Sequence, residues 1–183
     1  MTVDARSVSQ PHGWEPNDYQ RLLLTALGER DPADVQSETP GLLRGLVAEA
    51  GDDLRTPAAP GEWSVFECIG HIVDDELVVG VRYRWILSHD EPDVAPFDQD
   101  LWVDRLHNDP GESIDDLLEL FEALRRANLR LWRSRPPADR DRLGMHAERG
   151  PESYGLNFRL IAGHDLVHMD QARKALAQVH SGG

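Results

Sequence analysis

Apolar residues recur every three or four positions through most of this 183-residue chain, which is the spacing of amphipathic helices. Four segments carry the pattern: residues 17–50, 64–88, 113–135 and 153–179. We interpret the first as one helical element that is broken near residues 30–38, with Pro40 in the first turn of its second half. No segment alternates convincingly between apolar and polar residues as a strand does. The pattern therefore predicts an all-α protein, built as a four-helix bundle.

The polar stretches between these patterns predict how the helices begin and connect. Ser64 and Glu67 have the spacing of a capping box, which marks a helix start. Residues 89–111 contain three prolines and are too long for a tight hairpin, so we expect a long crossover connection between the second and third helices. Residues 1–13 are polar and predict a flexible tail, which leaves 14–180 as a single helical domain.

Composition narrows the classes of partner. The chain has 33 acidic and 19 basic residues, and its net charge of −14 disfavours binding to nucleic acid or to a membrane surface. It shows neither a secretion signal nor an apolar run long enough to span a membrane. We expect a cytoplasmic protein that binds a small-molecule substrate, with a second copy of the chain as a possible partner.

The single cysteine, Cys68, excludes a thiolate-rich metal site; a buried structural thiol is favoured over a soft ligand.

Three histidines are the strongest chemical signal. His164 and His168 lie four residues apart on the interior-facing line of the last helix, so both imidazoles occupy one face. His71 lies in a similar setting on the second helix. Neutral imidazoles on facing helices can hold one metal ion and leave a fourth position open. The alternative is three separate core histidines, each of which needs its own hydrogen-bond partner.

Other residues are weaker candidates, and each has a structural alternative. Asp75, one turn after His71, is a candidate catalytic residue that orients an imidazole or accepts a proton; it fits a solvated acid equally well. Gln171 is a candidate contact to a metal ligand, although a buried amide bonded to backbone is slightly favoured. We expect His146 to shape the mouth of a pocket or cap a helix, and Asn128 to line the pocket. Trp63 and Trp102 are candidates for the wall of an apolar cavity.

Four short segments together resemble the DinB-like (YfiT-like) superfamily: Trp63–Glu67, His71–Glu76, His146–Gly150 and Gly163–Gln171. The resemblance spans about residues 17–179. It implies a four-helix bundle with a long crossover, which binds a divalent metal through one histidine of the second helix and two of the fourth. Those positions are His71, His164 and His168 in this chain.

The resemblance leaves two hypotheses for function. Similar proteins include thiol S-transferases that use bacillithiol or mycothiol and a mycothiol-dependent isomerase. The first hypothesis is therefore a metal-dependent transferase or isomerase with Zn²⁺ or Ni²⁺ and a low-molecular-weight thiol, or a hydrolase if thiols do not bind. Arg82 or Arg84 would offset the charge of an anionic co-substrate. The second is a non-catalytic metal-binding or stress-responsive module with a structural or regulatory metal. A cavity over the metal favours the first, whereas a site closed by an acid such as Asp75 favours the second.

Overall fold

The computed structural model describes residues 15–182, so the predicted tail at 1–13 lies outside the described residues. Six α-helices dominate the described part of the chain: α1 (Asp18–Leu27), α2 (Pro32–Ala50), α3 (Val65–Ser88), α4 (Gln99–Leu106), α5 (Ile114–Ser134) and α6 (Tyr154–Gly182). Short 3₁₀ helices follow α2 and α5, η1 (Gly51–Arg55) and η2 (Pro137–Asp141). Three short strands complete it: β1 (Asp93–Val94), β2 (Leu143–His146) and β3 (Gly150–Ser153).

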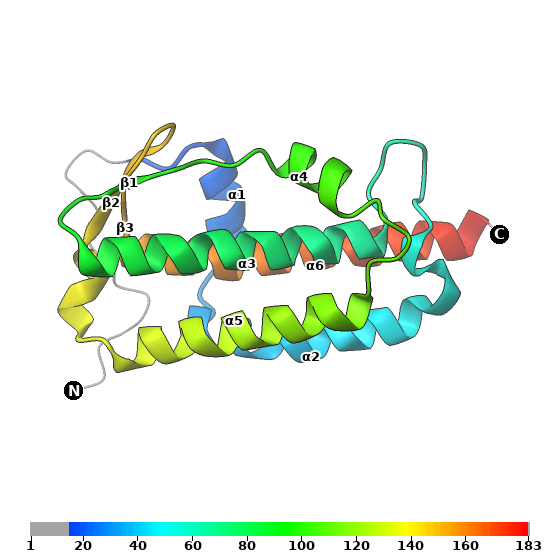
Figure 1. The fold of residues 1–183 in the computed structure, drawn as a ribbon, viewed down its shortest axis with the longest axis horizontal. Helices are drawn as coiled ribbons and strands as arrows, with labels where there is room; N and C mark the ends of the chain where they lie inside the picture. Colours follow the sequence, from blue (N-terminus) through cyan, green and yellow to red (C-terminus); the bar gives the residue numbers. More distant parts are fainter. Residues whose placement is uncertain (1–14, 183) are drawn as a thin grey trace.

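The long helices α2, α3, α5 and α6 form a four-helix bundle, as predicted (Figure 1). Helix α3 packs on α5 and α6, and α2 packs on the same two helices, so α2 and α3 lie mainly on opposite corners. Helices α3 and α5 run in the same direction, which a tight turn cannot achieve. The chain instead returns along the bundle through β1 and α4, which confirms the predicted long crossover.

The first predicted helical element is divided earlier than expected. Helix α1 ends at Gly28, which has a positive φ of 55°, and Asp31 caps the start of α2 at Pro32. The break therefore lies at 28–31, not 30–38, and Pro40 sits inside α2 instead of in a first turn. Proline lacks the N–H that the carbonyl of Gln36 would accept. Arg125 Nη1 donates to that carbonyl at 3.1 Å, which explains how the helix continues.

Helix α1 crosses α6 at a glycine. A Cβ built on Gly163 would lie 2.1 Å from the carbonyl oxygen of Leu23, so only glycine allows the two backbones to approach this closely. This contact brings the side chains of Tyr19 and Gln20 beside the middle of α6.

The structure adds three short strands that the sequence pattern did not reveal. Strands β1, β2 and β3 form a small sheet in that order, with β1 parallel and β3 antiparallel to β2. At two to four residues each, the strands are too short to display a sequence alternation. The sheet joins the crossover to the α5–α6 connection at one end of the bundle (Figure 1), and the β2–β3 turn carries Glu148 and Arg149.

A buried histidine holds the crossover against α3. His107, at the end of α4, places Nε2 2.9 Å from Asp74 Oδ2 and Nδ1 3.1 Å from the Glu112 carboxylate. Its ring lies so close to Gly70 that an added Cβ would meet the ring at 2.5 Å. The crossover is thereby fixed beside the predicted histidine site, where Phe97 of the crossover stacks on His71.

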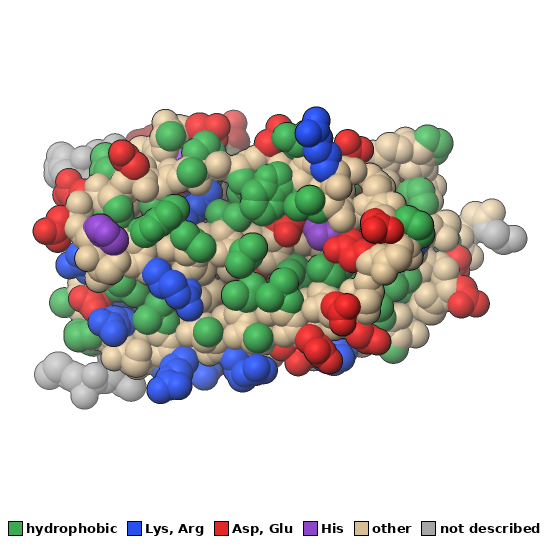
Figure 2. Space-filling view, viewed as in Figure 1, with side chains coloured by type: hydrophobic (Ala, Val, Ile, Leu, Met, Phe, Trp, Pro, Cys, Tyr) green, Lys and Arg blue, Asp and Glu red, His purple; other side chains and the backbone are tan. Residues whose placement is uncertain are grey.

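One face of the bundle keeps apolar side chains at the surface. Figure 2 shows them along the middle of the face formed by α3 and α5. The large apolar residues of these two helices that are exposed are Leu77, Val81, Trp85 and Leu120. Within residues 15–182 no helix is long and apolar enough to cross a membrane.

Candidate metal centre

The structure brings the three predicted histidines together in the bundle interior. His71 of α3 and His164 and His168 of α6 are all buried, and their candidate ligand nitrogens lie within 4.8 Å of one another. The Nε2 atoms of His71 and His164 are 2.9 Å apart. The four-residue spacing on α6 and the antiparallel packing of α3 on α6 together produce this cluster.

The polar atoms of this cluster fit a metal ion. His71 Nδ1 and His168 Nε2 are buried and have no hydrogen-bond partner among residues 15–182. Burial and the neighbouring imidazoles lower the pKa of His71 to about 2, and burial lowers the pKa of His164 and His168. The three rings are therefore neutral and offer lone pairs, as metal ligands must. A set of three imidazoles suits Zn²⁺ or Ni²⁺ better than the oxygen-preferring Mg²⁺ or Ca²⁺.

The surroundings of the histidines orient and cover them. His168 Nδ1 donates to Gln171 Oε1 at 2.8 Å, which leaves Nε2 as the lone-pair nitrogen facing the cluster. Gln171 thus bonds to an imidazole, not to the backbone as was slightly favoured. Trp63 packs on His71 and His168 with ring centroids at 5.1 and 6.2 Å, and Phe97 stacks on His71 at 6.4 Å.

Asp75 lies against a different histidine from the one it follows in sequence. Its Oδ2 is 3.4 Å from Nε2 of His164, and its side chain is largely buried. The preceding residue, Asp74, points away from the cluster and binds His107. Asp75 can therefore orient His164 or accept a proton beside the cluster.

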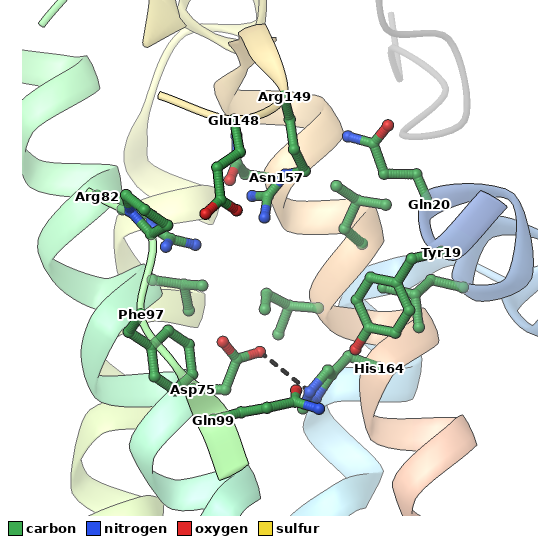
Figure 3. A pocket seen from close by; sticks show the side chains of 15 residues that line it. Tyr19, Gln20, Asp75, Arg82, Phe97, Gln99, Glu148, Arg149, Asn157 and His164 are labelled. Atoms are coloured by element: carbon green, nitrogen blue, oxygen red, sulfur yellow. Dashed lines mark ion pairs between the residues drawn. The ribbon is translucent and has the colours of Figure 1, made fainter. Parts of the chain in front are cut away.

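A cavity of about 110 Å³ reaches the cluster at Asp75 and His164 (Figure 3). Helices α1, α3 and α6, the crossover and the β2–β3 turn all contribute to its wall. Arg82, Glu148, Arg149 and Asn157 lie at the end away from His164. The rest of the lining is supplied by Tyr19, Gln20, Leu23, Val79, Pro96, Phe97, Gln99, Leu160 and Ile161.

A second, larger cavity borders the cluster at His168. Its volume is about 600 Å³, and Trp63, His168, Gln171 and Lys174 are among the residues that line it. Gln99 contributes to both cavities. The two cavities therefore border different imidazoles of the cluster, the first that of His164 and the second that of His168.

The remaining sequence candidates lie outside the cluster. His146 is buried in β2, and its Nδ1 accepts from the backbone N–H groups of Glu148 and Arg149, so it shapes the turn at the rim of the cavity. Burial and the charge of Arg149 lower the pKa of His146 to about 4.

Cys68 is a buried thiol, and burial raises its pKa to about 12. Trp102 contacts Phe97 but lines neither cavity.

Asn128 does not line the cavity, contrary to the sequence prediction. Its Nδ2 donates to Glu76 Oε1 at 2.8 Å within a fully buried network. Arg125 lies at the centre of this network, with Nη2 2.9 Å from Glu76 Oε2 and 3.0 Å from Asp165 Oδ1. The network ties α5 to α3 and α6 next to the histidines, and Thr39 of α2 donates to Asp165 at 2.7 Å.

The sequence contained a signal for this network. Arg125 continues the interior stripe of α5, which runs through Leu118, Phe121, Asn128 and Trp132. A charged residue at such a position is almost never fully buried without a partner. An arginine in line with core residues therefore predicts buried acids on the facing helices.

The fold and site place this chain in a known family: it belongs to the DinB superfamily, whose family model matches residues 33–172. A protein of Oceanobacillus iheyensis named "Putative metal-dependent hydrolase" is 29% identical over 133 residues, 72% of this chain and 76% of that protein. A protein of the same name from Geobacillus thermodenitrificans is 32% identical over 107 residues, 58% of this chain and 60% of that protein.

A solved structure shares the whole fold. YfiT from Bacillus subtilis, described as "a probable metal-dependent hydrolase with an unusual four-helix bundle topology", matches with a TM-score of 0.73. The match covers 98% of this chain and 99% of that chain at 18% sequence identity. At this identity the likeness establishes the four-helix topology with its long crossover.

Proposed function

We propose that this protein is a metal-dependent hydrolase in which His71, His164 and His168 hold a divalent ion, Zn²⁺ or Ni²⁺. The observation that carries the proposal is the convergence of three neutral imidazoles at the end of a cavity, where Asp75 also lies. The names of the relatives from Oceanobacillus and Geobacillus support the same class of reaction. The substrate is a small molecule, because the cavity is about 110 Å³.

The protein's own residues have distinct tasks in this proposal. His71, His164 and His168 would hold the divalent ion, which would supply Lewis acidity for activating water and polarising the substrate. Asp75 Oδ2 accepts the proton that the attacking water loses and returns it to the leaving group as the substrate bond breaks. Gln171 holds the tautomer of His168. Trp63 and Phe97 cover the imidazoles and limit the access of bulk water.

The cavity also separates this proposal from a non-catalytic metal-binding module. A structural or regulatory site would be sealed, whereas His164 and Asp75 both border a space of substrate size. The distinction depends on whether Asp75 is a ligand or a base. The Asp75→Asn variant is expected to keep its metal and to lose about 100-fold or more in turnover. Loss of the metal in Asp75→Asn would make the carboxylate a ligand and favour the closed, non-catalytic site.

Metal analysis of untagged protein tests the ligand set directly. We expect close to one divalent ion per chain, and the His71→Ala, His164→Ala and His168→Ala variants should each lose most of it. His146→Ala, which removes a buried histidine outside the cluster, should retain the ion. Full occupancy in two of the three cluster variants would refute the assignment.

Thiol S-transfer is a second candidate, and the second cavity favours it. A space of about 600 Å³ beside His168 offers room for a co-substrate next to a different imidazole from the one that Asp75 contacts. In Co²⁺-substituted protein, a small thiol such as N-acetylcysteine is then expected to shift the visible absorption, and the His71→Ala variant should show no shift. An unchanged spectrum at millimolar thiol would eliminate this candidate and leave hydrolysis.

A further inference from the structure

Arg82 is a buried cation that faces the cavity and forms no ion pair with any residue in 15–182. Its side chain lines the cavity wall from α3, and the residue is only 5% exposed. Its Nη2 donates to the carbonyl of Ala95 at 2.6 Å, but its Nε is buried and has no hydrogen-bond partner among residues 15–182. No carboxylate in the described part of the chain forms an ion pair with Arg82. A buried guanidinium in this state is costly unless a ligand completes its bonds.

The neighbouring charges do not complete them. Arg149 is occupied by Glu152, with its Nε 2.6 Å from Oε1 and its Nη2 3.0 Å from Oε2. Gln20 donates to the same carboxylate at 2.6 Å. Glu148 faces the cavity near Arg82 but is an exposed residue of the β2–β3 turn. Among the described residues, Arg82 is therefore the cation at this end of the cavity that no carboxylate pairs with, and it is available to bind an anion.

The position of Arg82 relative to the histidines follows from helix geometry. On α3, Asp75 and Arg82 are separated by seven residues, or about 10 Å along the axis. On α6, which runs antiparallel, His164 and Asn157 have the same separation. Val79 and Ile161 occupy the middle of these intervals, and all six residues line the cavity (Figure 3). The cavity thus has a reactive end, an apolar middle and a cationic end.

We propose that Arg82 is the anion-binding residue of the substrate site and that the substrate is a small monocarboxylate. Its carboxylate pairs with Arg82, its apolar middle contacts Val79 and Ile161, and its reacting bond lies at Asp75 and His164. A carboxylate matches the planar fork of the guanidinium. A phosphate dianion fits less well, because one unpaired cation among the described residues faces it and the Glu148 carboxylate repels a dianion more strongly than a monoanion. The position of the reacting bond rests on the proposed function; the carboxylate subsite does not.

Binding to metal-free protein tests the subsite independently of any reaction. Hexanoate and hexanamide have the same length and differ in charge, so we would titrate both into chelator-treated protein by NMR. Hexanoate is expected to bind at least tenfold more tightly than hexanamide. Arg82→Gln should abolish this preference, and Arg84→Gln should preserve it, because Arg84 bonds to Gly80 and Asn128 outside the cavity. Glu148→Gln should strengthen hexanoate binding, since it removes a facing negative charge.

Equal binding of the two probes, or an unchanged preference in Arg82→Gln, would overturn the proposal. Arg82→Lys keeps the charge but loses the fork, so it should retain a reduced preference; it also covers the case in which Arg82→Gln does not fold. Circular dichroism of each variant reports folding separately.

The orientation of the probe is tested in Co²⁺-loaded wild-type protein. Paramagnetic relaxation of bound hexanoate should be strongest at the methyl group and weakest next to the carboxylate, because Arg82 holds the carboxylate at the far end. The reverse order would show the carboxylate at the metal and overturn the proposal. If Co²⁺ does not load at all, the proposed metal function fails while the Arg82-dependent preference in metal-free protein still stands or falls on its own.

Discussion

A single side-chain amide determines which nitrogen of His168 faces the other imidazoles. Gln171 Oε1 can only accept, so it holds the proton on Nδ1 and leaves the Nε2 lone pair free. We predict that Gln171→Leu weakens metal binding by about 10- to 100-fold while the fold is retained. Gln178→Leu is the matched control, because Gln178 lines the same cavity two helical turns further along α6, and its side chain has no hydrogen bond to a histidine among the described residues. Competition with a chromogenic chelator measures both; equal affinities would contradict this role.

At the level of single residues, the sequence predicted positions better than partners. Helical spacing was sufficient to place His164 and His168 on one face, because i and i+4 side chains always share one. It could not show that Asp75 meets His164 instead of His71, since that contact depends on how α3 packs on α6. The prediction that Asn128 lines the pocket was wrong for the same reason. Its position on α5 faces the interior, but its side-chain amide donates to Glu76 and accepts from Arg84.

At the level of elements, the α1–α6 crossing depends on Gly163. A Cβ at this position would meet backbone atoms of Leu23, which cannot move aside as a side chain can. We predict that Gly163→Ala lowers the free energy of unfolding by about 1–3 kcal/mol, which is the usual cost of overpacking. The substitution should also displace α1 from the cavity. Thermal or urea unfolding measures the first effect, and accessibility of Tyr19 to a nitrating reagent measures the second.

Gly45→Ala provides the control for this substitution. Gly45 lies on the exposed face of α2, and a Cβ added there would have no neighbour within 4 Å. Alanine there should be neutral or stabilising by up to about 1 kcal/mol, because glycine is a poor helix former. A similar loss of stability in both variants would contradict the close approach of α1 and α6.

The attachment of the crossover should depend on pH through His107. Burial alone would lower its pKa, but hydrogen bonds to Asp74 and Glu112 outweigh burial and raise the pKa above the ordinary value of 6.5. A raised folded-state pKa stabilises the protein fully below the unfolded pKa, and this contribution is lost as pH rises through the folded pKa. Relative to His107→Gln, the wild type should therefore have its largest excess melting temperature near about pH 5.5 and a smaller one near about pH 9. A constant difference would contradict the charged His107 bridge.

Element boundaries were predictable where local chemistry sets them. Ser64 and Glu67 form the expected capping box, and Ser113 caps α5. The sheet was missed because β1 of the crossover is stabilised by pairing with β2, and the paired residues, such as Asp93 and Met145, are 52 positions apart in the sequence. Helix α4 was hidden for a similar reason: with eight residues, it is held by its contacts with α3 instead of by a long apolar stripe.

At the level of the whole molecule, Arg125 of α5 connects all four bundle helices. It pairs with Glu76 of α3 and Asp165 of α6, and it donates to the carbonyl of Gln36 in α2, which Pro40 leaves without a backbone donor. Arg125→Met would leave Glu76 and Asp165 buried without their cation. Breaking a buried ion pair in this way costs about 3–5 kcal/mol, so we expect a loss of that size in the free energy of unfolding. The exposed neighbour provides the control: Arg126→Met should change it by less than about 0.5 kcal/mol. Chemical denaturation of both variants decides whether the network contributes this much stability.

The same packing argument predicts what happens when metal is removed from the whole protein. The bundle buries apolar side chains from all four long helices, and apolar burial contributes about 25 cal/mol per Å² whether or not a metal is bound. Small zinc-dependent domains differ because they lack such a core and unfold without their metal. Chelation should therefore leave the helical circular dichroism largely intact and lower the melting temperature, since an ion that binds only the folded state stabilises it by mass action. Re-addition of Zn²⁺ should restore the melting temperature in wild type but not in His164→Ala. Collapse of the helical signal on chelation would instead show a structural metal and favour the non-catalytic alternative over the hydrolase.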